Sequence, residues 1–459
     1  MTDRPSPSPL RHELAATLRL AVPLAATNLL QMLVYAIDVV FVARLGSEEL
    51  AAASLATTLF GLVMWCLLGM TGACAPLIAA EIGRRSHAVR EVRRSARMAL
   101  WLAFGSGLCA MALFTRSEQL LLLVGQDPVV SAKAGRFMEI LLWAVIPNVM
   151  AGVLRNVVSV LGRPVFATAI TALAILVNAL GNYAFVFGHF GAPALGLDGS
   201  AISSVITATI MLAAYAATIR ADRRLHRYRL AGRLWRPEWS RLADLVRIGL
   251  PIALIILAEG GLFSSAAFLM GLIGAAQLAG HTIALQVAAL AFQVPFGIGQ
   301  AAAIRVGYHF GAGDWPAIGR AGRAAFGLGV AYMVLPAALM IFAPRAVLGF
   351  YVDLSDPANA AMIAHAVAYL IVAAAFQLFD GAQAVLSGAL RGLQDTRVPL
   401  LIALAGYWLF GFTTSAALGF LTPLSGLGVW LGLAVGLIVV AALLGWRWSR
   451  RERLGLVPA

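Results

Sequence analysis

Long apolar stretches recur from one end of this 459-residue chain to the other, and they constrain its fold more than any other feature. Each is long enough to cross the hydrocarbon core of a bilayer, about 30 Å, as an α-helix. They are rich in Leu, Ala and Val and lack the short alternation typical of barrel strands. We count twelve, with approximate cores at 17–43, 51–80, 97–115, 133–153, 164–188, 199–219, 246–271, 277–304, 321–343, 358–388, 398–418 and 424–446. The sequence therefore predicts an all-α polytopic membrane protein of twelve transmembrane helices.

The composition excludes a water-soluble globular protein. Hydrophobic residues make up 61% of the chain and charged residues only 12%, far from the balance of soluble domains. The three cysteines, Cys66, Cys74 and Cys109, lie in apolar stretches without the spacing of a disulfide or metal site, so we expect them to be packing residues.

The basic residues indicate the topology. The formal net charge is +13, which by itself could suggest an anionic partner. When loops are assigned alternately to the two sides, however, 29 of the 34 Lys and Arg residues fall on one side. Such an excess marks cytoplasmic loops. We therefore expect both termini and the 220–245 loop to be cytoplasmic, and we expect no nucleic-acid partner.

The chain contains an internal repeat. An offset of 228 residues places Pro23 on Pro251 and Gly46 on Gly274, and the register holds for about sixty residues. Because each half has an even number of spans, the repeats are parallel, which is a transporter architecture. We predict two six-helix lobes, 1–222 and 246–459, around a central cavity and joined by a basic linker at 223–245.

Three acids, Asp38, Glu259 and Asp380, lie deep in the predicted spans, and no Lys or Arg lies comparably deep in any span. Apolar surroundings disfavour the charged form of a carboxyl group. Such a group can hold a proton, bind a cation or exchange one for the other. The alternative role is structural, in which a protonated acid hydrogen-bonds a neighbouring helix.

Polar side chains accompany these acids at helical spacings. The expected cavity-facing residues are Asn28, Gln31 and Tyr35 on the first helix, Asn178 and Asn182 on the fifth, and Gln377 and Gln383 on the tenth. Spacings of three and four residues place such side chains on one helix face. The repeat offset also places Gln31 on Glu259, so we expect the two lobes to differ chemically at one shared position.

Motifs of several enzyme classes are absent. Lys133 is the only lysine, so the chain has no P-loop, and it has no H-E-x-x-H, C-x-x-C or G-x-S-x-G. We expect no cofactor and expect transport to be driven by an ion gradient. Glu259 and Asp380 offer hard oxygen ligands to Na⁺, and two carboxylates suit a proton equally well.

Five segments, in order, resemble one known family. They are LAVPLAATNLLQMLVYAIDVVFVARLGSEELAAASLATTL, LGNYAFVFGHFGAPALGLDGSAISSVI, GLPIALIILAEGGLFSSAAFLMGLIGAAQLAGHTIALQV, AIRVGYHFGAGD and FQLFDGAQAVLSGALRGLQDTRVPLL. The chain resembles the multidrug and toxic compound extrusion transporters, in particular their NorM-type bacterial branch. That resemblance implies protonation at Asp38, sodium or proton coupling at Glu259 and Asp380, and polar cavity positions at Asn178 and Asn182.

The residues and the resemblance together predict a secondary antiporter of a bacterial inner membrane. It would export cationic amphipathic compounds in exchange for H⁺ or Na⁺ by alternating access, and we expect it to be a monomer. Aromatic residues could add cation–π attraction. One alternative is a lipid-linked oligosaccharide flippase of the same superfamily, which would call for basic residues in the cavity. A second is an intramembrane enzyme, which would need two acids in close reach.

Overall fold

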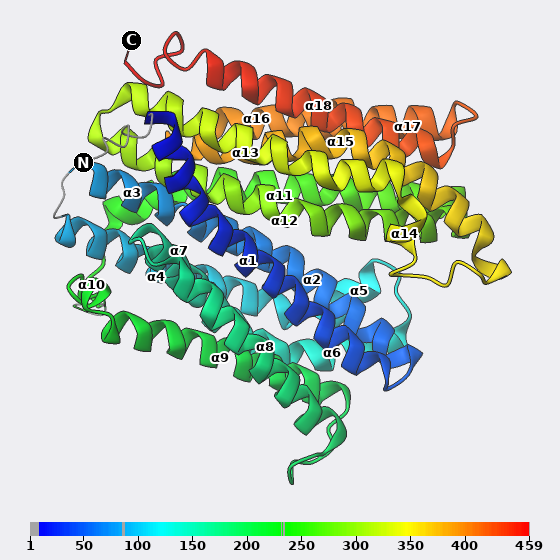
Figure 1. Cartoon of the computed structure of the whole chain (residues 1–459). Coiled ribbons are helices and arrows are strands. Elements are labelled where there is room, and N and C mark those ends of the chain that lie inside the picture. The colour runs from blue at the N-terminus through cyan, green and yellow to red at the C-terminus, as the bar shows by residue number, and fades with distance from the viewer. Residues whose placement is uncertain (1–8, 85–87, 231, 233–234, 459) are drawn as a thin grey trace, which may run out of the picture. The chain divides into compact units, whose positions relative to one another are not determined.

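The computed structural model describes residues 9–84, 88–230, 232 and 235–458, and within them it contains helices and no strands (Figure 1). The elements of the first half are α1 (Pro9–Ala43), α2 (Ser47–Gly72), α3 (Cys74–Arg84), α4 (Val89–Phe114), α5 (Ser117–Leu123), α6 (Pro128–Leu141), η1 (Leu142–Ala144), α7 (Val145–Val160), α8 (Pro164–Phe187), α9 (Leu197–Ala221) and α10 (Arg223–His226). Those of the second half are α11 (Trp239–Ile273), α12 (Ala275–Ala312), α13 (Trp315–Phe342), α14 (Pro344–Leu348), η2 (Pro357–Asn359), α15 (Ala360–Gly392), α16 (Arg397–Leu404), η3 (Ala405–Phe412), α17 (Thr413–Phe420) and α18 (Gly426–Ser449).

Twelve helical segments of the described chain are long and apolar enough to cross a membrane, which confirms the predicted class and number. Several extend beyond their predicted cores. The fourth spans Pro128–Val160 and the eighth spans Ala275–Ala312, whereas hydropathy alone limited them to 133–153 and 277–304. A helix continues past its apolar core because each backbone hydrogen bond stays inside the segment, whatever the side chains are.

The chain forms two compact units whose boundaries cut through two helices. Unit 2 is Ala26–Ala253, and unit 1 combines the residues up to Ala25 with Leu254–Ala459. The first part of α1 therefore packs with the second repeat, and the first part of α11 packs with the first repeat. The two cuts lie 228 residues apart, each two residues after a proline inside the helix, Pro23 or Pro251. Each repeat thus begins its first helix in the other repeat's unit.

Glycines allow these crossing segments to pack closely. In unit 1, a Cβ added to Gly297 of α12 would lie 2.7 Å from the backbone nitrogen of Ala25. In unit 2, a Cβ on Gly249 of α11 would lie 2.2 Å from the carbonyl oxygen of Met70. Because the obstructing atoms are backbone, only glycine allows this approach at either position.

Ion pairs also hold the crossing segments. In unit 1, Glu13 of α1 accepts hydrogen bonds from Arg305 Nη2 at 2.6 Å and lies 2.9 Å from His309 Nε2. In unit 2, Arg241 of α11 pairs with Glu81 of α3. The repeat offset places Glu13 on Arg241 and Glu81 on His309. The two contacts are therefore equivalent, with the acid on opposite partners.

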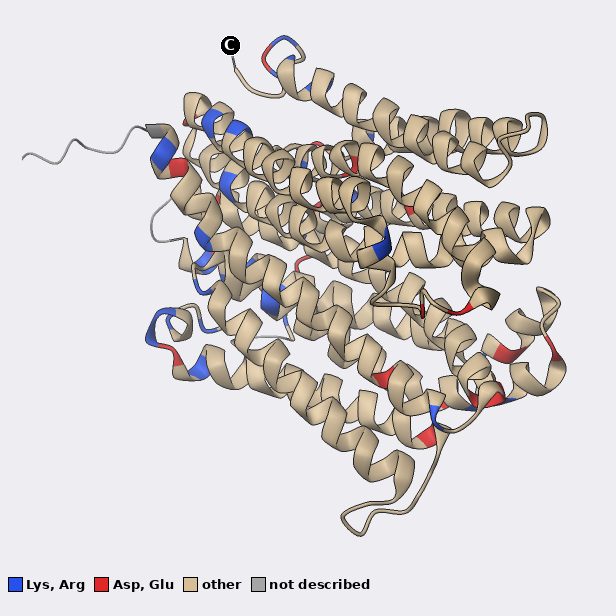
Figure 2. Cartoon of the chain, turned by 45° about the vertical axis from the view of Figure 1, so that its right-hand side comes forward, with Lys and Arg blue, Asp and Glu red and all other residues tan. Residues whose placement is uncertain are grey.

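Arginines in each unit, taken by itself, gather toward one end of the helices, while most of the helix length carries no charge (Figure 2). This is the sequence asymmetry seen in three dimensions. Their acidic partners at that end include Glu13 and Glu81, both buried.

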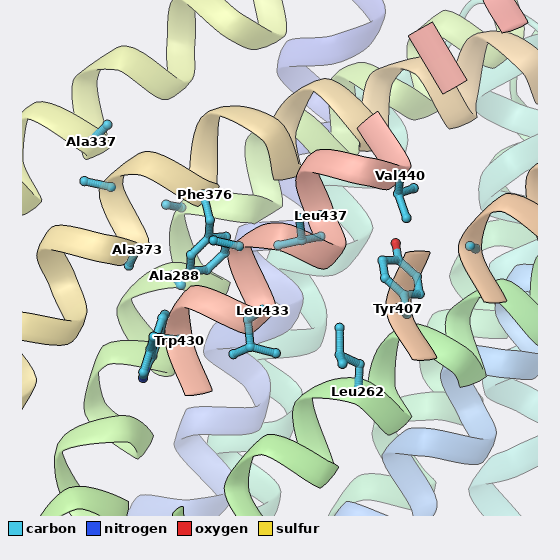
Figure 3. Packing of buried hydrophobic residues seen from close by; sticks show 14 of the residues in the cluster. Leu262, Ala288, Ala337, Ala373, Phe376, Tyr407, Trp430, Leu433, Leu437 and Val440 are labelled. Atoms are coloured by element: carbon cyan, nitrogen blue, oxygen red, sulfur yellow. The ribbon is translucent and has the colours of Figure 1, made fainter. Parts of the chain in front are cut away.

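The core of unit 1 is built from aromatic and branched side chains that face α18. Trp430, Leu433 and Leu437 of this helix are fully buried and lie among Phe376 of α15 and Tyr407 of η3 (Figure 3). The Phe376 and Trp430 rings have centroids 5.5 Å apart. Phe376 is therefore a packing residue of this core.

Candidate functional site

Asp38 of α1 is the centre of a polar network in unit 2. Its Oδ1 accepts hydrogen bonds from Asn178 Nδ2 at 2.9 Å and from Asn182 Nδ2 at 2.8 Å. Its Oδ2 accepts a longer bond, 3.3 Å, from Ser204 Oγ of α9. The structure thus brings together the acid and both asparagines singled out by the sequence, and all the hydrogen bonds given to this carboxylate come from uncharged donors.

The two asparagines are held by the packing of α8 against α9. Both are completely buried and occupy one face of α8 because they are four residues apart. Asn182 Nδ2 also lies 3.0 Å from the Asn178 carbonyl oxygen, and that oxygen accepts from Ser203 Oγ at 3.0 Å. Gly181 lies at the same crossing, where an added Cβ would lie 2.4 Å from Ser203 Oγ.

The other polar residues of the first helix have separate partners. Tyr35 is 43% exposed, and its hydroxyl donates to the backbone carbonyl of Thr57 at 2.7 Å. Asn28 is buried. Gln31 does not contact Asp38; its Oε1 accepts from Arg155 Nη1 of α7 at 2.8 Å.

Arg155 is buried in the protein, although the sequence placed it in a loop. Its side chain is 8% exposed. The fourth apolar core was predicted to end at residue 153, which put Arg155 in a loop, but α7 continues to Val160 and carries this guanidinium into the packed interior. A buried positive charge therefore lies beside the polar stripe of α1.

Glu259 and Asp380 form the second acidic centre, in unit 1. Gln383 Nε2 lies 3.0 Å from Glu259 Oε1 and 3.2 Å from Asp380 Oδ1. Since both carboxylate oxygens contact the same nitrogen, the two acids share one donor. Tyr407 donates its hydroxyl to Gln383 Oε1 at 2.9 Å. Asp380, Gln383 and Tyr407 are all buried.

Two further polar residues of α15 lie before and after this centre in the sequence. Gln377 is completely buried, but its Nε2 donates to the Ala288 carbonyl at 2.9 Å rather than to an acid. Arg391 lies in the last turn of α15, eight residues beyond Gln383.

The Gln31–Arg155 contact of unit 2, not the Asp38 network, is the repeat equivalent of the Glu259–Gln383 contact. The offset of 228 residues places Gln31 on Glu259 and Arg155 on Gln383. In unit 2 the fourth-helix residue, Arg155, donates to Gln31, and in unit 1 its equivalent, Gln383, donates to Glu259. The same hydrogen bond is thus built twice. In unit 2 the donor is the Arg155 guanidinium and the acceptor is an amide, whereas in unit 1 the donor is an amide and the acceptor is the Glu259 carboxylate.

Sequence reasoning missed three members of these networks, Ser204, Arg155 and Tyr407. Ser204 is one of many small polar residues in apolar helices, so nothing distinguished it. Arg155 could have been found by applying the repeat offset to Gln383. Tyr407 gave no such signal.

In both centres, carboxylates accept hydrogen bonds from neutral side chains. Among the described residues, no cluster of three or more His, Cys, Asp and Glu side chains could hold a metal ion. The three acids can accept a proton or a monovalent cation. They are also the groups that would balance the charge of an organic cation.

Known proteins similar to this chain are transporters. The MatE family model matches it twice, at residues 23–184 and 251–416, so the two matches begin at Pro23 and Pro251. The chain is 44% identical over 444 residues to the probable multidrug resistance protein NorM of Mesorhizobium japonicum, covering 97% of this chain and 95% of that protein. It is 39% identical over 448 residues to the multidrug resistance protein NorM of Burkholderia vietnamiensis, covering 96% and 95%.

Solved structures show the same fold at low identity. An outward-facing multidrug resistance MATE family transporter of the MOP superfamily has a TM-score of 0.87 at 20% identity, with 99% of this chain and 100% of that one covered. The eukaryotic MATE transporter AtDTX14 has a TM-score of 0.85 at 21% identity, with 98% and 100% covered. At these identities the likeness concerns the fold alone.

Proposed function

The chain belongs to the MATE family of multidrug efflux transporters, and we propose that it is a secondary antiporter that exports cationic amphipathic compounds in exchange for H⁺ or Na⁺. It is a multi-pass membrane protein and not an enzyme. The observation that carries the proposal is that each compact unit contains its own acidic centre, Asp38 in one and Glu259 with Asp380 in the other.

The surroundings of the acids favour exchange over a fixed ion pair. Among the described residues, Asp38 accepts hydrogen bonds from two amides and a hydroxyl, and such donors stabilise a carboxylate without neutralising it. The charge therefore remains available to a cation. An organic cation and a coupling ion would compete for the same oxygens, so binding of one would release the other.

The acid pair of unit 1 gives the coupling ion a second site. Glu259 and Asp380 share one amide donor, so two negative groups lie close together. The repulsion between two close carboxylates is relieved when they bind one proton or one monovalent cation. This supports an ion-exchange role at that centre and fits H⁺ and Na⁺ alike.

We also propose the orientation in the membrane. The excess of arginines at one end of the helices follows the positive-inside pattern, which supports cytoplasmic termini in a bacterial inner membrane. The relatives' names, all of them multidrug resistance proteins, favour efflux over the flippase alternative, although Arg155 supplies the kind of basic group that a flippase would use.

Reconstituted vesicles test the proposal directly. Efflux of a cationic dye is measured with a proton gradient and a sodium gradient imposed separately. We expect one gradient to drive efflux by wild-type protein and expect Asp38→Asn, Glu259→Gln and Asp380→Asn each to abolish or strongly reduce it. If all three variants retain wild-type efflux and ion dependence, the proposal is wrong.

A further inference from the structure

Gln383 occupies a central position between three groups. Its amide nitrogen lies within 3.2 Å of an oxygen of each acid, and its amide oxygen lies 2.9 Å from the Tyr407 hydroxyl. Since a phenol can donate to an amide oxygen, this arrangement turns the NH₂ group toward the carboxylates. The reverse orientation would place an amide oxygen against two carboxylate oxygens, which repel it.

The backbone around Tyr407 is unusual. Tyr407 lies in η3, a π-helix that runs from Ala405 to Phe412 in the middle of a span. π-Helices are rare, and they occur frequently at functional sites because the extra residue per turn redirects a side chain. Here the redirected side chain is a completely buried tyrosine whose hydroxyl reaches the acid centre.

Glycines hold η3 against α18. A Cβ on Gly406 would lie 2.3 Å from Val440 Cγ2, and a Cβ on Gly411 would lie 3.2 Å from Gly436 Cα. The ring of Tyr407 lies near Leu262 and Val440 (Figure 3). The position of the hydroxyl is thus fixed by close backbone packing and by the core, and a flexible loop plays no part.

The repeat shows what is specific to this unit. In unit 2 the offset of 228 residues places Arg155 on Gln383, and Arg155 donates to a neutral Gln31. A guanidinium has only donors, so its orientation toward an amide oxygen needs no further residue. An amide has two different ends, and in unit 1 a tyrosine is present to orient it.

We propose that Tyr407 and Gln383 are positioning residues that hold Glu259 and Asp380 as a single ion-exchanging pair. This inference rests on the proposed function for the identity of the exchanged ion. Tyr407 polarises the amide by donating to its oxygen, and the polarised NH₂ group stabilises both ionised acids.

The test compares two tyrosine variants of the full-length protein. Tyr407→Phe removes only the hydroxyl at the acid centre. Tyr369→Phe is its matched control, because Tyr369 is also completely buried in unit 1 and also donates to a glutamine, Gln277, at 3.1 Å. Both variants lose one tyrosine–glutamine hydrogen bond, buried for Tyr407 and part-buried for Tyr369, but only the first loss touches the acids.

The measurement is the ion concentration at which the acids change state. Infrared spectra of purified protein without dye report the carboxylate bands during separate H⁺ and Na⁺ titrations, with Glu259→Gln and Asp380→Asn used to assign those bands. We expect Tyr407→Phe to reach half-change at about fivefold lower ion concentration, since loss of one hydrogen bond, about 1 kcal/mol, corresponds to that factor. Tyr369→Phe should leave the half-change concentration unmoved.

Each outcome decides the matter. A similar shift in both variants, or no shift in Tyr407→Phe, overturns the positioning role. If Tyr407→Phe does not fold, Gln383→Leu tests the same relay and should separate the assigned bands into two independent transitions. Dye efflux is measured in parallel: a shift in the bands without ion-dependent efflux would support the positioning role and refute the proposed antiport.

Discussion

Replacement of Asp38 by Ala and by Asn should separate the structural role of this residue from its role in coupling. Asn178 is completely buried, and the hydrogen-bond acceptor that its amide group has in the structure is Asp38 Oδ1 at 2.9 Å. Asp38→Ala removes that acceptor, and an unsatisfied buried donor costs about 1–3 kcal/mol. Asn182 is affected less, because its amide also lies 3.0 Å from the Asn178 carbonyl.

Asp38→Asn keeps an acceptor oxygen in place. Both asparagine amides bind the same carboxylate oxygen, so a side-chain amide can present its oxygen to them and its NH₂ group toward Ser204, whose hydroxyl can also accept. We expect its stability to remain within about 1 kcal/mol of wild type. Asp38→Ala should be the less stable of the two, and both should lose ion-dependent efflux.

Two assays on the same preparations check these expectations. Thermal unfolding in detergent, followed by size-exclusion chromatography, ranks the stabilities, and dye efflux from vesicles measures coupling. Ser204→Ala is a useful third variant, because it removes only the longest bond, 3.3 Å, and should be the mildest. Equal melting of Asp38→Ala and Asp38→Asn would refute the account of Asn178, and ion-dependent efflux by Asp38→Asn would refute the coupling role.

Three further predictions concern the rest of the chain. Glu13→Gln should destabilise the protein by about 2–3 kcal/mol in thermal unfolding, near the low end for a broken buried pair because Arg305 is 18% exposed; a wild-type melting temperature would contradict this. Gly297→Ala should lower the stability of the protein by about 1–3 kcal/mol, because the new Cβ would lie 2.7 Å from the Ala25 backbone. Gly327→Ala, whose Cβ would have nothing within 4 Å, should instead stabilise its helix by about 0.5–1 kcal/mol. If Gly297→Ala were the more stable variant, the close contact at Gly297 would have to relax freely. Hydrogen bonds from Ser355 hold the pKa of Asp353 below its usual value, so the turn should be ordered above the ordinary pKa of Asp and should loosen as the pH falls through the lowered pKa of Asp353. Hydrogen exchange of the 350–357 loop as a function of pH measures this loosening. Unchanged exchange from neutral to acidic pH would contradict the prediction.

The sequence predicted the number and class of the helices because membrane spans depend mainly on local hydropathy, which needs no knowledge of neighbours. It also indicated Asp38 with Asn178 and Asn182, since helical spacing and the scarcity of deep polar residues are both visible in one dimension. The contact of Gln383 with Glu259 is different, because it joins positions 124 residues apart. Only the packing of α15 against α11 creates it.

Helix ends and local backbone form were the weakest points of the prediction. Arg155 was assigned to a loop because hydropathy falls where α7 in fact continues. The π-helix at η3 has no distinctive composition, and the close packing of its glycines against α18 is visible only in the tertiary structure. The residues that orient the acids were thus harder to predict than the acids themselves.

The crossing of α1 and α11 between units has a consequence for synthesis on the ribosome. Glu13 is among the first described residues to be made, yet its partner Arg305 follows 292 residues later. Unit 2 likewise remains incomplete until the first part of α11 has been made, up to Ala253. The start of α1 must therefore wait, inserted but without its final neighbours, while the whole first repeat is produced. A membrane chaperone or the insertion machinery has its longest opportunity to protect, or to degrade, the nascent protein during this interval.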